Sequence, residues 1–540
     1  MSENPNAKLN TSSVETQRDL RIITMNKLIE KGINPFPAGS KRDYKLLEVK
    51  TDFQDLAKKF TEISPQKITL AGRIKRKRSS GKIGFVVLED ESLPSGFQLV
   101  FKSDILPEET IVETQLLSYT DFKTLIDDGD YIQASGYLAE SSTGEPSLYV
   151  QEFKILTKAL RPLPDKMDYD NLEARYLNRV ADFKMNTVDE NGVSVRDLIR
   201  IKHKYWSIWR EEMEKEGFMS VENPTFELIP GGAEAKPFVT FYNELDQEMY
   251  LRISLELPLK KLIAGGFESV YEIGRVFRNE GSSPQHLQDY TAIEWYKAYT
   301  DYNWAAIFVK RVYQRMIKEI LGDYIQTDYY GSSINWGDWC DEETAKKNNW
   351  ELVGGWPKIK YFDAVRYFTN GKIDTENKTA EELLKMCSEN EIKDVKLEDG
   401  VATLLDKLWK KARLNTTNPF FLVLPPVELE PLAKRNAERP DLTERWQVVA
   451  GKAELGKAFS ELNDPIDQFG RFEEQQEARD NGNEEAQFMD KDYVKAMEYG
   501  MPPMSGFGTS ERFVSFLLSK HIRECSSFPY VKEQVNNAKS

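Results

Sequence analysis

Apolar residues recur with two different spacings along the N-terminal part of the chain. Residues 13–31 place Leu20, Ile23 and Leu28 roughly on one face of a predicted amphipathic helix. Farther along, within residues 66–157, five short runs of alternating apolar residues are separated by Gly, Ser and Pro. This second spacing predicts strands joined by turns. A helical lead-in followed by an all-β domain is therefore expected.

Five strands in close succession favour a small closed β-barrel of the OB type, with a half-exposed β-sandwich as the alternative. The proline-rich stretch ALRPLPDK then indicates a linker, residues 158–185. The predicted second domain, residues 186–540, opens with a helix capped by Ser194 and Asp197 and stopped by Gly217. It continues with strand-like runs, among them EMYLRISLE and SVYEIGRVF, that predict adjacent antiparallel strands beside a polar cavity.

Two segments lie outside this regular pattern. Residues 1–65 are predicted to be an N-terminal extension that carries the helix. Residues from about 320 to 415 are rich in Lys, Asp, Glu and Asn and carry no motif, and we expect a helical insertion there. The predicted fold class is α+β, a five-stranded barrel followed by an antiparallel β-sheet flanked by helices.

Composition narrows the possible functions. The net charge of −15 argues against a protein that coats nucleic acid non-specifically, although GRIKRKRSSGK is a local run with six Lys/Arg and no acid. That run is either a basic binding patch or a solvated loop. No segment approaches the roughly 18 apolar residues of a membrane span. Three cysteines with no CxxC pair argue against a disulfide framework or a structural zinc site and suit a reducing cytoplasm.

The segment YEIGRVFRNEGSSPQHLQDYTAIEWY carries the most specific chemistry. It resembles the second signature of class II aminoacyl-tRNA synthetases. In the reaction of that family, an amino acid carboxylate attacks the α-phosphate of ATP. Because these two anions repel each other, the resemblance gives Arg278 the role of bridging them with its forked guanidinium. It also implies that Glu280 contacts the adenine amino group or the tRNA end. His286 would reach the outer phosphates, and Tyr290 would stack on adenine.

Two further segments resemble the same family. GFMSVENPTF is similar to the first signature, a helix followed by a proline-bearing strand, which in the family builds the dimer interface and places Pro224 there. GMPPMSGFGTSERFVSFLLSKHIRECSSFP is similar to the third signature, a glycine-rich strand running into a helix that receives nucleotide. Arg512 would lie over adenine opposite Tyr290. The resemblance thus implies these ATP-binding residues: Arg278, Glu280, His286, Tyr290, Glu454 and Arg512.

Three other segments, GGAEAKPFVTFYNELDQEMYLRISLELPLKKLIAGG, VELEPLAKR and ELGKAFSELNDP, resemble the lysine-specific branch of the family. Lysine has two ammonium groups, so its pocket needs carboxylates at both ends. By resemblance, Glu256 takes the α-ammonium, and Glu294 with Glu461 takes the ε-ammonium through charge-assisted hydrogen bonds worth roughly 1.5–3 kcal/mol each. The implied lysine-binding residues are Gly232, Glu256, Arg278, Glu294, Tyr296, Lys457, Phe459 and Glu461.

The same resemblance suggests a metal site with two departures from the family pattern. Glu454 and Glu461 could hold Mg²⁺ that bridges the ATP phosphates. The branch usually has a glutamate where this chain has Gln447, which leaves one metal position weakened or ligated through an amide oxygen. The branch also usually has Asn at the position of Lys457. We expect Lys457 to contact the substrate carboxylate. The alternative is that the Lys457 ammonium fills the lysine pocket. The family's second loop arginine is replaced by Gln285.

Three residues of the predicted barrel fall where related synthetases place anticodon contacts. Arg78 would provide a cation for phosphate, Phe85 a ring for stacking and Gln98 a reader of base edges. Phe85 could equally be an ordinary core residue.

The resemblance as a whole predicts a cytoplasmic homodimer that uses ATP and Mg²⁺ to load lysine onto tRNA(Lys), with Arg278 and Arg512 as catalytic residues. Positioning and electrostatics would carry the first step, because the attacking carboxylate is already ionised. Two alternatives remain open. An aspartate- or asparagine-specific relative is disfavoured by the carboxylate-rich pocket. A paralogue that modifies a protein lysine or acts as a regulatory binder is disfavoured by the barrel and by the retained arginines.

Overall fold

The computed structural model describes residues 14–164, 171–281, 283, 286–329, 331–480 and 486–531. The chain divides into two compact units, Met1–Val188 with Tyr530–Ser540, and Asp189–Pro529. The predicted linker therefore falls within the first unit, and part of it lies outside the described residues. In the described ranges, no helix is both long enough and apolar enough to cross a membrane.

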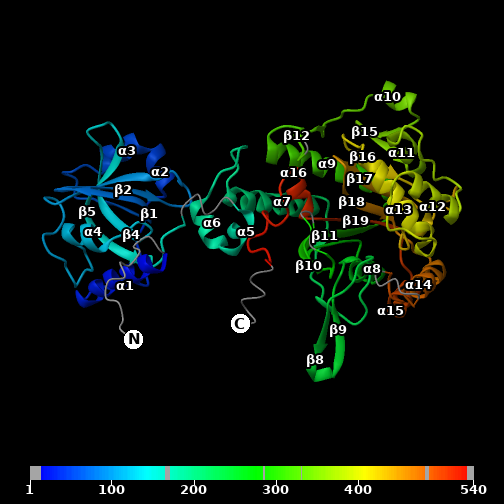
Figure 1. Cartoon of the computed structure of the whole chain (residues 1–540), viewed down its shortest axis with the longest axis horizontal. Helices are drawn as coiled ribbons and strands as arrows, with labels where there is room; N and C mark the ends of the chain where they lie inside the picture. The colour runs from blue at the N-terminus through cyan, green and yellow to red at the C-terminus, as the bar shows by residue number, and fades with distance from the viewer. Residues whose placement is uncertain are drawn as a thin grey trace, which may run out of the picture. The chain divides into compact units, whose positions relative to one another are not determined.

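The first unit is built on a closed barrel with the strand order β1-β2-β3-β5-β4 (Figure 1). Its strands are β1 (Ile68–Ser80), β2 (Ile83–Glu89), β3 (Phe97–Lys102), β4 (Tyr131–Glu140) and β5 (Pro146–Thr157). Helix α4 (Tyr119–Leu125) precedes β4 and stacks Phe122 on Phe101 inside the barrel, with ring centroids 4.2 Å apart. The predicted five-stranded barrel is confirmed, and the β-sandwich alternative is wrong.

In the described residues before the barrel, the helices are α1 (Val14–Glu30), α2 (Leu46–Thr51) and α3 (Phe53–Lys59). The helix predicted for residues 13–31 is α1, and residue 13 lies outside the described part. Of the three residues predicted to share an apolar face, only Leu28 is buried, whereas Leu20 and Ile23 are each 51% exposed. The predicted apolar face is therefore wrong for these two residues, because only the C-terminal end of α1 meets the core of the unit.

The second unit is built, in its described residues, on a nine-stranded sheet in the order β14-β15-β16-β17-β18-β19-β11-β10-β6. Its pairs are antiparallel except β6 with β10 and β15 with β16. The strands are β6 (Met219–Ser220), β10 (Ser269–Phe277), β11 (Asp289–Ala298), β14 (Glu351–Val353), β15 (Trp356–Lys360), β16 (Phe420–Val423), β17 (Arg445–Ala450), β18 (Ala453–Ser460) and β19 (Met504–Ser510). The predicted antiparallel sheet flanked by helices is confirmed.

Helices α7 (Val195–Lys215) and α9 (Tyr302–Leu321) pack on this sheet through a core that includes Trp209, Tyr313 and Phe507. As predicted, Ser194 caps α7 in a capping box with Asp197, and Gly217 follows its end with φ +78°. Smaller helices complete the covering layers of this unit: α8 (Glu256–Ala264), α14 (Pro465–Asp480), α15 (Lys491–Glu498) and α16 (Arg512–Leu517). Helices α5 (Leu172–Leu177) and α6 (Arg179–Met185) belong to the first unit.

The segment expected to be a helical insertion is only partly separate from the sheet. It contains α10 (Glu342–Lys347), α11 (Tyr361–Phe368), α12 (Ala380–Glu389) and α13 (Gly400–Arg413). It also supplies β14 and β15 to the central sheet, and a hairpin of β12 (Ile325–Thr327) and β13 (Ser333–Asn335). Its strands were missed because they are three to five residues long, too short for alternation to be recognised.

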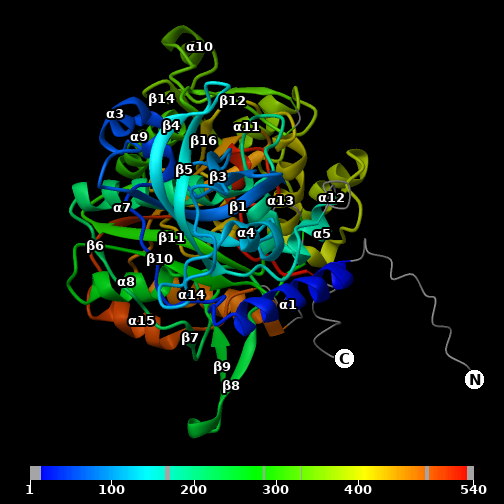
Figure 2. The same cartoon turned by 90° about the vertical axis from the view of Figure 1, so that its left-hand side faces the viewer.

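A three-stranded sheet projects from the second unit in both views (Figure 1, Figure 2). It comprises β7 (Phe226–Glu227), β9 (Gln247–Leu251) and β8 (Val239–Tyr242) in that order. The run EMYLRISLE, expected beside the strand SVYEIGRVF, instead forms β9 here and then enters α8. The strand ends at Leu251, and α8 begins five residues later at Glu256.

We expect the buried ion pair of Lys158 to hold the end of the barrel. Lys158 Nζ lies 2.8 Å from Asp130 Oδ2, and both side chains are fully buried. Lys158→Ala leaves an uncompensated buried charge and should cost about 3–5 kcal/mol of barrel stability. Lys67→Ala, which breaks the partly exposed pair with Glu152, should cost roughly 0–1 kcal/mol. Hydrogen exchange of the β4 and β5 amides, read by mass spectrometry, measures both; equal losses would contradict this assignment.

Candidate functional site

A cavity of about 520 Å³ lies on the central sheet, lined by residues of β10, β11, β18 and β19 and by the starts of α8 and α16. Every residue predicted to bind ATP or lysine lines it: Gly232, Glu256, Arg278, Glu280, His286, Tyr290, Glu294, Tyr296, Glu454, Lys457, Phe459, Glu461 and Arg512. Residues more than 200 positions apart in sequence are thus brought to one site.

Strand register explains how these side chains meet. One row across the sheet pairs Phe459 with Gly506 and Gly506 with Tyr296. The next row pairs Lys457 with Gly508 and Gly508 with Glu294. Because β19 carries glycines in the middle of both rows, the side chains of β18 and β11 face each other over a floor of bare backbone.

Gly506 has no room for a side chain. A Cβ atom there would lie 2.2 Å from the Tyr296 ring and 2.4 Å from Glu461 Oε1. The resemblance to the third signature assigns this glycine-rich strand to nucleotide binding. In the structure, the nearest neighbours of Gly506 are residues of the predicted lysine pocket.

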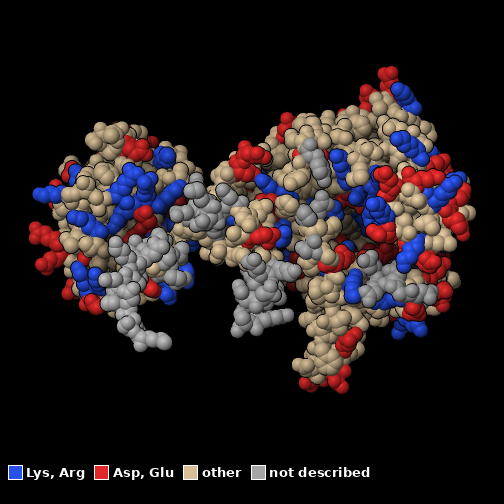
Figure 3. All heavy atoms as spheres, viewed as in Figure 1, with Lys and Arg blue, Asp and Glu red and all other residues tan. Residues whose placement is uncertain are grey.

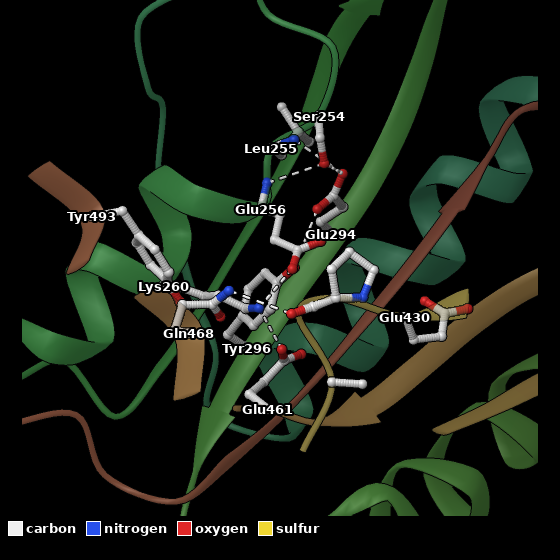
Figure 4. A network of polar contacts seen from close by, with 12 residues as sticks. Ser254, Leu255, Glu256, Lys260, Glu294, Tyr296, Glu430, Glu461, Gln468 and Tyr493 are labelled. Carbon is white, nitrogen blue, oxygen red and sulfur yellow. Dashed lines mark hydrogen bonds and ion pairs between the residues drawn. The ribbon is translucent and has the colours of Figure 1, made fainter. Parts of the chain in front are cut away.

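A buried lysine of the chain itself lies among the predicted lysine-binding carboxylates (Figure 4). Lys260 Nζ is 2.6 Å from Glu256 Oε1 and 2.5 Å from Glu461 Oε2, and its side chain is fully buried. Burial opposes a charged lysine, but the two carboxylates raise its pKa well above the usual value. Lys260 is therefore a permanent cation within this cluster.

Glu294 faces the same cluster from β11. The Ser254 hydroxyl and the Leu255 N–H donate to its Oε1 at 2.7 and 3.0 Å, and the Tyr296 hydroxyl donates to its Oε2 at 3.3 Å. Burial and the charge of Glu256 raise the pKa of Glu294 to about 7. Burial also raises the pKa of Glu461, although Lys260 opposes the shift. A cationic ligand would relieve this crowding of negative charge.

The other end of the cavity is cationic. Arg278 follows β10, donates through Nε to the Ile253 carbonyl at 3.2 Å, and lies 5.8 Å from the Tyr290 ring centroid. His286 contacts the Ser283 hydroxyl through Nδ1 at 2.7 Å. Burial lowers the pKa of His286, and Arg512, Arg278 and Lys410 lower it further. Gln285 lies outside the described residues.

Arg512 begins α16, where the third-signature resemblance placed it. The preceding Glu511, which stands where the family more often has Asp, accepts from the Thr291 N–H at 3.1 Å and forms an ion pair with Lys202. These contacts fix the start of α16 against β11 and α7. The short GFGTSER strand therefore still delivers Arg512 to the cavity.

The predicted metal ligands are each bonded to a cation of the chain. Glu454 Oε1 lies 2.6 Å from Arg413 Nη1 and accepts from Trp409 Nε1 at 2.8 Å. Glu461 is paired with Lys260, and Gln447 accepts from Arg445 at 2.8 Å. Among the described residues, no group of three or more His, Cys, Asp or Glu side chains could hold a metal ion.

Lys457 does not lie between the pocket carboxylates. Its Nζ is 3.2 Å from Glu430 Oε2 and 5.3 Å from the centroid of the Phe459 ring, and its side chain is 49% exposed. The alternative in which Lys457 fills the lysine pocket is therefore wrong. The cation within the carboxylate cluster is Lys260.

The three predicted anticodon contacts share one face of the barrel. Arg78 on β1 is the register partner of Phe85 on β2, and Gln98 on β3 is the partner of Val87, two residues from Phe85. Phe85 is 38% exposed, so it is not an ordinary core residue. Gln98 donates to the Ser147 hydroxyl at 2.8 Å. Lys and Arg side chains gather over β1 and β2 (Figure 3).

Sequence reasoning missed several charged residues of the site: Lys260, Lys410, Arg413, Glu430 and Arg445. The spacing of Glu256 and Lys260, four apart on a helix, was a signal for the first of these. Arg413 had no such signal, because α13 belongs to the segment that carries no motif.

Comparisons with known proteins place these features in context. A family model described as tRNA synthetases class II (D, K and N) matches residues 174–532, and one described as OB-fold nucleic acid binding domain matches residues 68–156. The lysine–tRNA ligase of Bacillus subtilis is 37% identical over 530 residues, covering 97% of this chain and 99% of that protein. Those of Magnetococcus marinus and Fervidobacterium nodosum are 36% and 34% identical, covering 95% and 96% of this chain and 96% and 94% of their own lengths.

The raised pKa of Glu294 predicts how the unliganded protein responds to pH. A carboxyl whose pKa is higher in the folded than in the unfolded chain stabilises the fold below its unfolded pKa, and that contribution is lost as pH rises through about 7. Melting temperature should therefore fall between pH 5.5 and 8.5. Glu294→Gln should flatten the decline, and Glu498→Gln, an exposed change in the same unit, should leave it intact. Identical slopes for both variants would argue against a strained Glu294.

Proposed function

The chain belongs to the class II tRNA synthetases of the aspartate, lysine and asparagine group, and we propose that it is a lysine–tRNA ligase. The observation that carries the proposal is the trio of buried carboxylates, Glu256, Glu294 and Glu461, at one end of a cavity whose other end is cationic. Lysine presents the complementary charges, two ammonium groups and one carboxylate. Its relatives over nearly the full length carry that name.

The charges of the pocket balance when lysine is bound. Glu256, Glu294 and Glu461 provide three negative charges, of which Lys260 neutralises one. The α- and ε-ammonium groups of lysine supply the remaining two positive charges. A ligand with an acidic or amide side chain would leave buried carboxylates unpaired, which is costly. This argues against the aspartate and asparagine alternatives.

The proposed reaction has two steps. A carboxylate oxygen of lysine attacks the α-phosphorus of ATP, the bond to the bridging oxygen of the β-phosphate breaks, and pyrophosphate leaves. Arg278 would hold the carboxylate and α-phosphate together, and Arg512 with Tyr290 would hold the adenine. A ribose hydroxyl at the tRNA end then attacks the carbonyl of lysyl-adenylate and AMP leaves. Both arginines act by positioning and by charge that is already oriented.

The barrel is the proposed tRNA-binding domain, and tRNA(Lys) its ligand. Phe85 is an exposed ring beside Arg78 on the same face. In the described part of the chain, Arg76 and Arg78 have no ion-pair partner, so their charges are available to phosphate. A stacking ring flanked by unpaired cations is typical of single-stranded RNA recognition.

An exposed apolar surface supports a homodimer. Phe226, Leu228, Val239, Phe241 and Leu245, on and beside the projecting sheet, are each 55–58% exposed. Pro224 is also exposed and adjoins β7. Several exposed large apolar side chains on neighbouring strands are typical of an interaction surface. We propose that a second copy of the chain covers it.

Two further requirements complete the proposal. The family generally uses ATP with a divalent metal ion, and we propose Mg²⁺ as that ion, entering with the phosphates of ATP. We also propose a cytoplasmic location. The three cysteines, all buried and free of disulfides, support a reducing compartment.

Lysine alone among the common amino acids should drive ATP–pyrophosphate exchange. Glu294→Gln should raise the lysine requirement about 10-fold or more, since it removes a charge-assisted contact of roughly 1.5–3 kcal/mol. Glu498→Gln serves as the matched control and should behave as wild type. Exchange driven equally by aspartate or asparagine would eliminate the lysine assignment, and absence of exchange with every amino acid would favour a regulatory binder.

Phe85→Ala should reduce charging of tRNA(Lys) while leaving pyrophosphate exchange unchanged. Loss of one base-stacking contact, worth roughly 1–3 kcal/mol, should lower kcat/KM for tRNA about 10-fold or more. Lys67→Ala, also on the barrel but outside this face, should have little effect. If Phe85→Ala charged tRNA at the wild-type rate, the anticodon-binding role of this face would have to be abandoned.

A further inference from the structure

The part of the cavity where the family resemblance places protein-held metal is occupied by cations of the chain. Arg413 lies 2.6 Å from Glu454, and Arg445 donates to Gln447 at 2.8 Å. Arg445 Nε also lies 2.9 Å from Glu430 Oε1, and Lys457 lies 3.2 Å from the other oxygen of Glu430. Three fixed cations thus surround the two carboxylates Glu430 and Glu454.

These residues do not fit a divalent ion held by the protein. A metal on Glu454 would bind the group whose Oε1 already pairs with the Arg413 guanidinium, so two like charges would compete for one carboxylate. The oxygen of Gln447 is taken by Arg445, and Glu461 is taken by Lys260. Mg²⁺ needs several oxygen ligands in nearly octahedral geometry, and among the described residues no group of three or more His, Cys, Asp or Glu side chains could supply them.

Four cations line this end of the cavity, Arg278, Lys410, Lys457 and Arg512, of which Lys410 also lies 2.6 Å from Asp406 Oδ2. Lys410, one turn from Arg413 on α13, lines the cavity and lowers the pKa of His286 together with Arg512 and Arg278. Burial lowers the pKa of Arg512, and Arg413 adds to the shift while Glu454 opposes it. A partly buried cluster of like charges is unfavourable unless an anion enters it.

We propose that Lys410 and Lys457, which line the cavity, form with Arg413, which adjoins it through Glu454, a cationic wall that binds the outer phosphates of ATP directly and replaces a protein-held metal ion. The inference rests on the proposed function, because it identifies the anion as ATP. The ion that travels with the ATP phosphates is retained. Arg413 and Lys457 would exchange part of their bonding to Glu454 and Glu430 for phosphate oxygens, which suit guanidinium and ammonium donors.

The first experiment measures nucleotide binding by calorimetry, with the full-length protein in excess EDTA. Wild type should bind ATP without metal, and AMP more weakly because it lacks the outer phosphates. Lys410→Gln and Arg413→Gln should each weaken ATP binding about 10-fold or more in EDTA and leave AMP binding unchanged. Lys411→Gln, the neighbouring lysine on the same helix and outside the cavity lining, is the matched control.

The results distinguish phosphate binding by these residues from a purely structural role of Arg413. If Arg413 only holds α13 against β18, its replacement would weaken ATP and AMP alike, and Lys410→Gln would change neither. Lys410 is half-exposed, so its variant keeps the test valid if Arg413→Gln fails to fold. Failure of the wild-type protein to bind ATP in EDTA would overturn the proposal.

A second measurement counts metal ions by Mn²⁺ electron paramagnetic resonance. The complex of wild type with an unreactive ATP analogue should hold about one Mn²⁺ per cavity, the ion carried by the phosphates. Additional ions held only when protein is present would overturn the proposal. Neither measurement depends on lysine. Lysine-independent exchange would refute the proposed function, whereas a metal requirement for ATP binding would refute only the cationic wall.

Discussion

The Lys260 ammonium is the interaction on which the cavity depends. Glu256 and Glu461 converge on it at 2.6 and 2.5 Å, and all three residues are buried. Two ionised carboxylates this close would repel each other strongly in a low-dielectric interior, and a fixed cation removes most of that repulsion. It also holds α8 against the segment that follows β18. The pocket therefore has a preset geometry before any ligand arrives, and only the charge that Lys260 leaves uncompensated remains for the ligand.

The same principle operates at the opposite end of the cavity with the signs reversed. Arg413 pairs with Glu454, and Arg445 pairs with Glu430. In the proposed complex, phosphate takes over part of this pairing. The segment of about 320–415 contributes here through α13, which carries Trp409 and Arg413. A region without a recognisable motif thus supplies electrostatic groups to a site whose outline comes from the signatures. The cavity thus has carboxylates at one end and cations at the other, contributed by side chains from five or more helices and strands.

Much of this architecture could be predicted from the sequence, for identifiable reasons. The barrel was predictable because its strands are long and turn residues separate them. The cavity residues were predictable because this chain keeps the residue spacing of the family signatures. Lys260 was not assigned, since a lysine in an apolar helix usually reaches solvent and only tertiary contacts reveal that this one is buried. The short strands β14 and β15 were missed because alternation cannot be recognised over three to five residues, and β15 joins the sheet through β16, about 60 residues later in the chain.

The pairing of β11 with β19 has a consequence for the order in which the chain folds during synthesis. All strands of the barrel lie within residues 68–157, so that unit can close soon after it leaves the ribosome. The floor of the cavity cannot form until Gly506 and Gly508 of β19 have been synthesised, about 200 residues after their partner strand β11. The apolar β8–β9 hairpin emerges long before. In the proposed homodimer, two nascent chains could therefore meet through their hairpins while their central sheets are still incomplete, and assembly would then precede the completion of either cavity.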